Sequence, residues 1–333
     1  NSNLPVFVAS PKLFALMNDT TCQTTEKDGI NVRQIEMNGK TVELVRFGDV
    51  AEIKVGLQTG DNQYYLYQNP EARGSYKDIN QYIEFLLTDD ELEKISNDEE
   101  LRLKVINRGL HKNRNEDNFD PDLWFDGKYI VPHDKGGESD SESGWLPNYY
   151  VPTNYYIDWS CDSIIRIKTH TNSAGRISSR FQNITYYFRY GIDYSQTGIY
   201  CPTFRKNSNS VFNTEATSIF SIIDDYSLLG VLSSKLTKFL IKNFIDNSVH
   251  ASAEKLKSVS ILFFCELQNI KSLVDSLVEN QKQNPRYDYM SNEQKEIDRL
   301  VYEMYGLNDD DIKEVETWYA RRYPKLARFA EVE

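Results

Sequence analysis

The sequence predicts an α+β fold, with a mixed α/β lobe over residues 1–225 followed by a mainly helical lobe over residues 226–333. Up to about residue 223, short segments rich in β-branched and aromatic residues alternate with turn residues, which is typical of strands. From residue 226 onward, apolar residues recur at the three- and four-residue spacing of helices. The chain has 333 residues and is 40% hydrophobic, so it is long enough to bury a substantial core.

In the first lobe, Ser10 and Pro11 predict the start of a short helix, because proline is favoured in a first turn. Thr88 and Glu91 have the spacing of a capping box and open an acidic helix that runs toward Ile106. Strands are predicted at 42–47, 50–55, 63–67, 128–131, 164–168, 199–204 and 211–223.

In the second lobe, leucines and phenylalanines between 228 and 244 predict one helix, and apolar residues between 270 and 277 predict another. Ser291 and Gln294 have the spacing of a second capping box, ahead of a helix that Gly306 ends. Asn308 is expected to cap the last helix.

The net charge of −12 disfavours a nucleic-acid partner if it is spread evenly, but its distribution is uneven. Residues 89–100 carry seven acidic residues and one lysine, whereas residues 160–206 carry seven basic and two acidic residues. The basic stretch is also rich in tyrosine, and a local basic and aromatic surface can hold a phosphate backbone. From composition alone, a tyrosine-rich sheet core is the preferred interpretation of this stretch.

Known catalytic and cofactor motifs are not found in the sequence. There is no glycine-rich nucleotide loop, and the four cysteines and four histidines are too dispersed to predict a metal site or a disulfide framework. Asp122, Asp126 and Lys128 lie too close together for the usual nuclease arrangement. Residues 284–287 (NPRY) approximate the base-holding loop of adenine methyltransferases, but they fall between predicted helices. We therefore predict no catalytic and no metal-binding residues.

The chain is expected to be cytoplasmic and not to enter a membrane, since no run of eighteen apolar residues and no signal pattern occurs. It begins at Asn1 with an apolar stretch, which is more typical of a piece of a longer polypeptide than of a natural start. The pair Gly136-Gly137 after Lys135 would allow a phosphate or a base edge to approach the backbone closely, although on this pair alone a tight turn is the preferred interpretation.

Several segments, in one order along the chain, resemble a family. They are residues 47–62 (ending in GLQTGDN), 133–138 (HDKGGE), 149–159, 190–195 (YGIDYS), 204–206, 211–220, 229–235 (LGVLSSK) and 296–307. They are similar to the carboxy-terminal target recognition region of type IIG restriction enzymes, of Eco57I- and TaqI-like adenine-specific DNA methyltransferases, and of the methyltransferases of BREX phage-defence systems. The family's R-x-W-Y-G motif is replaced here by Gly144-Trp145-Leu146-Pro147, and tyrosine replaces the tryptophan of its GITWS motif.

The resemblance implies a DNA-binding specificity domain of a restriction–modification or phage-defence N6-adenine methyltransferase, without the catalytic domain. Its partners would be double-stranded DNA and the methyltransferase domain of the same polypeptide. S-adenosylmethionine would bind to that domain, and Mg²⁺ to an endonuclease if one is fused, so no cofactor is expected in this part. The DNA-binding residues that we predict are Gln58, Thr59, Asn62, Lys135, Gly136, Gly137, Arg176, Arg180, Arg189, Ser195, Arg205 and Lys206.

Two further expectations remain. Lys235, Lys238 and Lys242 share one predicted helix, and they are expected to contact flanking phosphates. The alternative function is a protein–protein docking module of a defence complex, for which the acidic segment 89–100 and the net charge would be suited.

Overall fold

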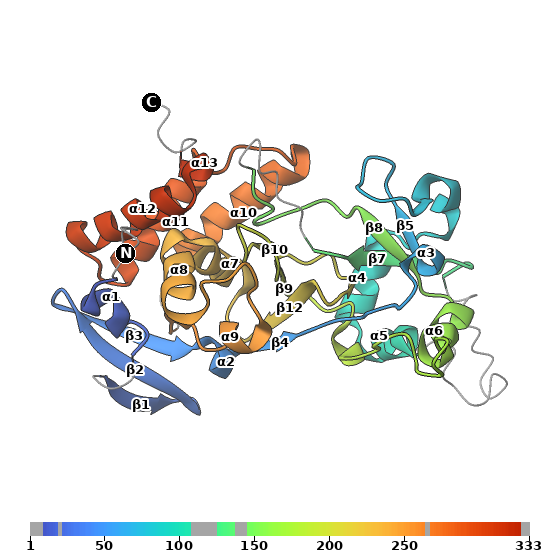
Figure 1. Cartoon of the computed structure of the whole chain (residues 1–333), viewed down its shortest axis with the longest axis horizontal. Coiled ribbons are helices and arrows are strands. Elements are labelled where there is room, and N and C mark those ends of the chain that lie inside the picture. The colour runs from blue at the N-terminus through green and yellow to red at the C-terminus, as the bar shows by residue number, and fades with distance from the viewer. Residues whose placement is uncertain (1–8, 19–21, 108–124, 137–144, 264–266, 328–333) are drawn as a thin grey trace, which may run out of the picture.

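The computed structural model describes residues 9–18, 22–107, 125–136, 145–263 and 267–327 (Figure 1). Within these residues, three β-sheets are combined with helices, which confirms the predicted α+β class. None of the helices described has both the length and the apolar character that crossing a membrane requires.

The first sheet is antiparallel and is built mainly from the beginning of the chain. Its strand order is β1 (Gln23–Lys27), β2 (Ile30–Met37), β3 (Lys40–Arg46) and β13 (Ser260–Leu262). Asp28-Gly29 and Asn38-Gly39 form its two tight turns, with φ values of 50°, 78°, 52° and 79°. Such dipeptides favour two-residue hairpins because both positions require a positive φ. β13 brings the C-terminal part of the chain back beside β3.

The second and third sheets are neighbours in space, and their strands alternate along the chain. The second is antiparallel, in the order β10 (Phe204–Lys206), β9 (Ile192–Ser195), β12 (Ala216–Ser221) and β4 (Ala51–Lys54). The third has the order β11 (Val211–Phe212), β7 (Ile130–Asp134), β8 (Tyr155–Asp158), β5 (Leu66–Gln68) and β6 (Lys77–Asp78). Because β11 follows β10 in the chain and pairs with β7, the two sheets meet at the end of β7.

Helices α3 (Asn62–Tyr65), α4 (Asp89–Asn97), α5 (Glu99–Ile106) and α6 (Cys161–Thr169) accompany the third sheet (Figure 1). The predicted capping box is confirmed, since Thr88 accepts the N–H of Glu91 and the Glu91 side chain accepts the N–H of Thr88. Asp98 then ends α4 and caps α5, so the acidic segment forms two helices rather than one. A 3-10 helix, Ile79–Phe85, precedes them.

The predicted strand at 164–168 is wrong, because these residues lie in α6. Ser160 accepts the N–H of Ser163 and so caps the first turn. Ile164 and Ile167, three residues apart, are both buried on one face of the helix. Burial of this face outweighs the preference of β-branched residues for strands.

Two more predicted strands are wrong in part. Residues 63–65 belong to α3, whose first turn is capped by Asp61, and strand pairing begins only at Leu66. Residues 199–203 form a loop before β10. Pro202 lies in this loop and has no N–H to donate to a neighbouring strand.

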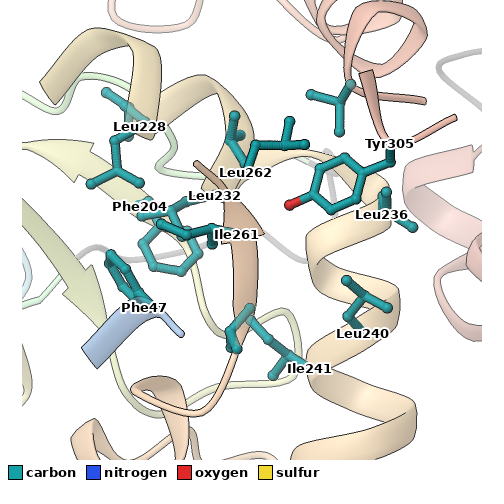
Figure 2. Packing of buried hydrophobic residues seen from close by; sticks show 14 of the residues in the cluster. Phe47, Phe204, Leu228, Leu232, Leu236, Leu240, Ile241, Ile261, Leu262 and Tyr305 are labelled. Atoms are coloured by element: carbon teal, nitrogen blue, oxygen red, sulfur yellow. The ribbon is translucent and has the colours of Figure 1, made fainter. Parts of the chain in front are cut away.

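The C-terminal part is mainly helical, as predicted. Its helices are α7 (Asp225–Ser233), α8 (Lys235–Leu240), α9 (Ala253–Leu256), α10 (Gln268–Gln283), α11 (Glu293–Met304), α12 (Asp309–Arg322) and α13 (Pro324–Ala327), and a π-helical turn, Ile241–Ile245, extends α8. Leucines spaced along α7 and α8 gather around Ile261 and Leu262 of β13 (Figure 2). The predicted short helix at Pro11 is α1 (Pro11–Ala15), and α2 (Phe47–Val50) joins β3 to β4.

One of the two predicted helix caps in this part is confirmed and the other is wrong. Asn308 caps α12 in a complete capping box with Asp311. α11 instead begins after Asn292 without a side-chain cap. The side chain of Gln294 cannot fold back toward Ser291, because it is buried and bonded to Tyr149 and Asp298.

Buried apolar residues form two large clusters that divide the chain into a body and an inserted lobe. The body cluster joins the first two sheets to α7, α8, α10, α11 and α12. The second cluster surrounds the third sheet. We call residues 55–191 the inserted lobe, although 146–149 return to pack in the body cluster. The predicted boundary between 225 and 226 falls inside the body cluster, which contains Ile223 and Leu228.

Candidate functional site

A groove with a cavity volume of about 850 Å³ lies between the body and the inserted lobe. The residues that line it belong to five stretches of chain: 69–73 with Asn80, 133–136, Trp145 with 151–155, 205–208 and 285–286. We call it the basic groove. Because these stretches are far apart in the sequence, no linear motif could have revealed it.

Basic side chains outnumber acidic ones in the basic groove. Among the residues that the structure describes, five basic residues line it, Arg73, Lys135, Arg205, Lys206 and Arg286, against two acidic residues, Glu71 and Asp134. The charges of Arg205 and Asp134 cancel in an ion pair of 2.7 Å. The remaining lining residues still carry an excess of positive charge, on a chain whose net charge is −12.

Lys135 is held at the groove by aromatic side chains. Its Nζ donates to Tyr76 Oη at 2.8 Å and lies 4.4 Å and 4.6 Å from the ring centroids of Tyr76 and Tyr155. The next residue, Gly136, has a φ of 100°, and its N–H donates to Asp134 Oδ1 at 2.7 Å. This φ favours glycine and turns the chain directly after β7. Gly137 lies outside the described residues.

Arg205 is buried at the base of the groove and is only 3% exposed. Its Nη2 donates to both carboxylate oxygens of Asp134 at 2.7 Å, and its Nη1 donates to Ser195 Oγ at 3.1 Å. Asp134 ends β7 in the third sheet, whereas Arg205 lies on β10 in the second. The ion pair therefore ties the inserted lobe to the body, and it occupies the guanidinium that we had predicted to contact DNA.

A second carboxyl group is buried beside this pair. Asp193 accepts a hydrogen bond from Ser218 Oγ and is fully buried. Burial and the neighbouring Asp134 carboxylate raise the pKa of Asp193 well above its usual range. Burial would also raise the pKa of Asp134, but Arg205, Asp193 and the N–H of Gly136 together hold it below its usual value. The cluster thus contains one carboxylate, one protonated carboxyl group and one guanidinium.

Arg286 reaches the groove from the body side. Asn284 Oδ1 accepts the backbone N–H of Arg286 at 3.1 Å, which shapes the turn between α10 and α11. The guanidinium lies 4.5 Å from the ring centroid of Trp145. The sequence correctly placed residues 284–287 in an inter-helix loop, but it did not predict that this loop lines a groove. The sequence signal that could have pointed to this loop is Arg286, which stands where the base-holding pattern of adenine methyltransferases has its second proline.

Arg73 is the other basic residue that we did not predict. It is exposed and belongs to the loop that precedes Gly74. Tyr155 Oη donates to the Arg73 carbonyl oxygen at 2.6 Å and so fixes the loop to β8. Nothing in the sequence around Arg73 distinguishes it from other surface arginines.

Five of the predicted DNA-binding residues lie together, but they do not line the basic groove. Gln58 and Arg180 exchange backbone hydrogen bonds of 3.1 Å and 2.8 Å, and Thr59 Oγ1 donates to Asn62 Oδ1 at 2.6 Å. Arg176 lies in the exposed turn that leads back toward Arg180. Some of the predicted residues therefore line the basic groove, whereas these five form a second surface near α3 and α6.

The last predicted residues, Arg189 and Lys206, contact aromatic rings. The Arg189 guanidinium lies 5.2 Å and 5.4 Å from the ring centroids of Tyr186 and Phe220. Lys206 Nζ donates to Tyr226 Oη at 3.1 Å. Lys206 belongs to the basic groove, whereas Arg189 does not line it.

The expected phosphate contacts of Lys235, Lys238 and Lys242 are wrong, because all three amino groups are engaged inside the protein. Lys235 Nζ pairs with Glu316 at 2.7 Å. Lys238 is 8% exposed and donates to the carbonyl oxygen of Tyr200, and Lys242 is 2% exposed and donates to the carbonyl oxygen of Ser248.

Burial of Lys238 makes the stability of the protein depend on pH. Burial, with the nearby charges of Lys242 and Arg322, lowers the pKa of Lys238 to about 7, whereas its usual value is 10.5. Between these two values the unfolded chain binds more protons than the folded one, so this group makes stability increase as the pH rises. Lys238→Met should remove that increase. Urea unfolding at several pH values measures the free energy of unfolding of the variant and of the unaltered chain. If this free energy depends on pH equally steeply in both, the prediction is refuted.

The sequence matches no protein-family model and no curated protein. The support for a function therefore comes from the basic groove and from the order of the family-like segments in the sequence.

Proposed function

We propose that this chain binds double-stranded DNA in the basic groove and reads its sequence there. The supporting observation is that Arg73, Lys135, Lys206 and Arg286, from four separate stretches of an acidic chain, converge on one groove. Cationic side chains arranged in this way bind a phosphate backbone, and their contacts set the register of the duplex.

The groove contains groups for both kinds of DNA contact. Arg73 and Arg286 are exposed on walls contributed by different parts of the chain and suit phosphates. Lys135 follows a strand end and is held by two tyrosines, so its ammonium group is oriented well enough to donate to a base edge such as guanine O6 or N7. A cavity of about 850 Å³ accommodates one edge of a duplex, and the rest of the helix stays outside.

The order of family-like segments in the sequence supports a more specific role, as the target recognition part of a restriction–modification or phage-defence N6-adenine methyltransferase. In this proposal, S-adenosylmethionine and the catalytic residues belong to another domain of the same cytoplasmic polypeptide. Mg²⁺ is needed only where an endonuclease is also fused. The residues described here serve to bind and discriminate DNA.

Selection from a random duplex library at low and moderate salt tests the proposal. We expect enrichment of one sequence motif, with an affinity that falls as salt rises, because each phosphate contact contributes about −0.9 to the slope of log affinity against log salt. The two phosphate contacts of Arg73 and Arg286 alone would give a slope of about −1.8. A chain that shows no binding to duplex DNA at low salt would contradict it, and would favour the docking function suggested by the exposed acidic residues of α4 and α5.

A further inference from the structure

A second, smaller cavity of about 210 Å³ adjoins the basic groove. Lys206 lines both, so the two spaces share a wall. The other walls of the small cavity include Tyr190, Ile192, Asp225 and Tyr226. Ligand pockets for whole small molecules usually measure about 300–1,000 Å³, so this one has room for a single flat group.

The surfaces of the small cavity are apolar and aromatic as well as charged. Ile192 and Leu229 are buried and supply an apolar wall. Tyr190 is 41% exposed and lines the cavity, so part of this aromatic residue is open to solvent. An exposed aromatic ring beside an apolar wall favours a planar guest.

The two acidic residues of the cavity have different roles. Asp224 caps α7 by accepting the N–H and the hydroxyl of Ser227, both at 2.9 Å, and it pairs with Lys271 at 2.8 Å. Asp225 is half-buried, and among the described residues no donor is hydrogen-bonded to its carboxylate. Burial and Asp224 raise the pKa of Asp225 to about 6, while Lys206 opposes this rise. Asp225 is therefore a carboxylate at pH 7.5 with its acceptor positions available to a guest.

The charge balance selects the kind of guest. Lys271 neutralises Asp224, which leaves the negative Asp225 and the positive Lys206 facing the cavity. A cationic guest would be repelled by Lys206 and an anionic guest by Asp225. A neutral guest that donates to a carboxylate and accepts from an ammonium group satisfies both residues.

We propose that this cavity binds one amino-bearing nucleobase (adenine, cytosine or guanine). The exocyclic amino group donates a hydrogen bond to Asp225, a ring nitrogen or carbonyl oxygen of the base accepts a hydrogen bond from Lys206, and Tyr190 stacks on the base. Thymine has no amino group, and its single N3–H donor lies between two carbonyl oxygens that repel the Asp225 carboxylate, so thymine should bind more weakly. This proposal rests on the proposed DNA-binding function. Moving a base out of the duplex costs a few kcal/mol, and the contacts between the protein and the DNA must offset that cost.

Binding of free nucleosides tests the cavity separately from DNA binding. We would titrate the whole chain with deoxycytidine, deoxyadenosine and thymidine at pH 7.5, followed by saturation-transfer NMR. The first two should bind, and thymidine should bind at least about tenfold more weakly. Asp225→Ala should weaken deoxycytidine binding at least about tenfold, as expected for loss of a hydrogen bond to a charged group. Glu93→Ala, which removes an exposed carboxylate from α4, serves as the control and should change nothing.

Each outcome bears on one proposal. Equal binding of thymidine and deoxycytidine, no binding of any nucleoside, or an unchanged affinity in Asp225→Ala would overturn the base-binding cavity. If nucleosides are discriminated while duplex DNA does not bind even at low salt, the cavity stands and the proposed function fails. If duplex DNA binds in a salt-dependent manner while nucleosides do not bind, the proposed function stands and the cavity fails.

Discussion

Replacing Asp134 with alanine is expected to lower the free energy of unfolding by about 3–5 kcal/mol, the usual cost of removing one partner of a buried ion pair. Arg205 is only 3% exposed and makes two of its hydrogen bonds to Asp134, so the variant would remove these bonds, and the neighbouring Asp193 could supply the lost counter-charge only by giving up its proton. The loss should be visible as a lower urea midpoint, followed by tryptophan fluorescence.

Asp193→Asn is the matched control within the same buried cluster. Asp193 keeps its proton in the folded protein, and asparagine is a neutral group of the same shape that can still accept from Ser218. This variant should therefore be at least as stable as the unaltered chain at neutral pH. A loss as large as that of Asp134→Ala would contradict the assignment of the proton to Asp193.

The pH dependence of this control has a definite sign. The pKa of Asp193 is raised in the folded state, so its protonation stabilises the fold fully below the unfolded value of 3.8, and this contribution is lost as the pH rises. Asparagine does not titrate. As the pH rises above the unfolded value, the stability of Asp193→Asn should therefore increase relative to that of the unaltered chain.

Removing three positive charges from the basic groove is expected to reduce affinity for duplex DNA by about 1,000-fold or more at low salt, at about 1.5 kcal/mol for each charged contact. The triple variant is Arg73→Gln, Lys135→Gln and Arg286→Gln. Since each phosphate contact releases counterions, the slope of log affinity against log salt should also become shallower by about 2–3.

The matched control removes the same number of charges elsewhere. Lys94→Gln, Lys104→Gln and Arg299→Gln change the net charge equally, but these residues lie on α4, α5 and α11 and do not line the groove. The control should retain nearly all of the affinity at about 0.1 M salt, because charges that do not contact the duplex are screened over about 10 Å at that ionic strength. Equal losses in both variants would mean that total charge, and not the basic groove, determines binding.

Much of the fold could be predicted from the sequence where one local signal dominates. Helical spacing from Leu228 to Phe244 and the capping box at Thr88 each correctly predicted helical structure, although each stretch forms two helices, divided at Ser234 and at Asp98. β1 and β2 were not predicted, although Asp28-Gly29 and Asn38-Gly39 are strong hairpin signals. The strand assigned to 164–168 failed because burial of Ile164 and Ile167 on one helix face overrides β propensity.

The site was harder to predict, because it depends on distant stretches of chain. Lys135, Gly136 and Lys206 were predicted and do line the basic groove, whereas Arg286 was not, since the packing of α10 and α11 against the body decides where its loop lies. Arg205 was predicted as a surface contact. The sequence could not show that Asp134, 71 residues away, would neutralise it.

The path of the chain through the second sheet has an evolutionary consequence. The chain leaves the body after Lys54, which pairs with Ser218, and returns at Ile192, which pairs with the adjacent Ile219. β4 and β9 both flank β12, so exit and return are about 10 Å apart. Segments whose ends lie this close can be exchanged like modules. Under the proposed function, recombination could replace residues 55–191 and alter sequence preference, while the new module would inherit the phosphate contacts of Lys206 and Arg286 from the body.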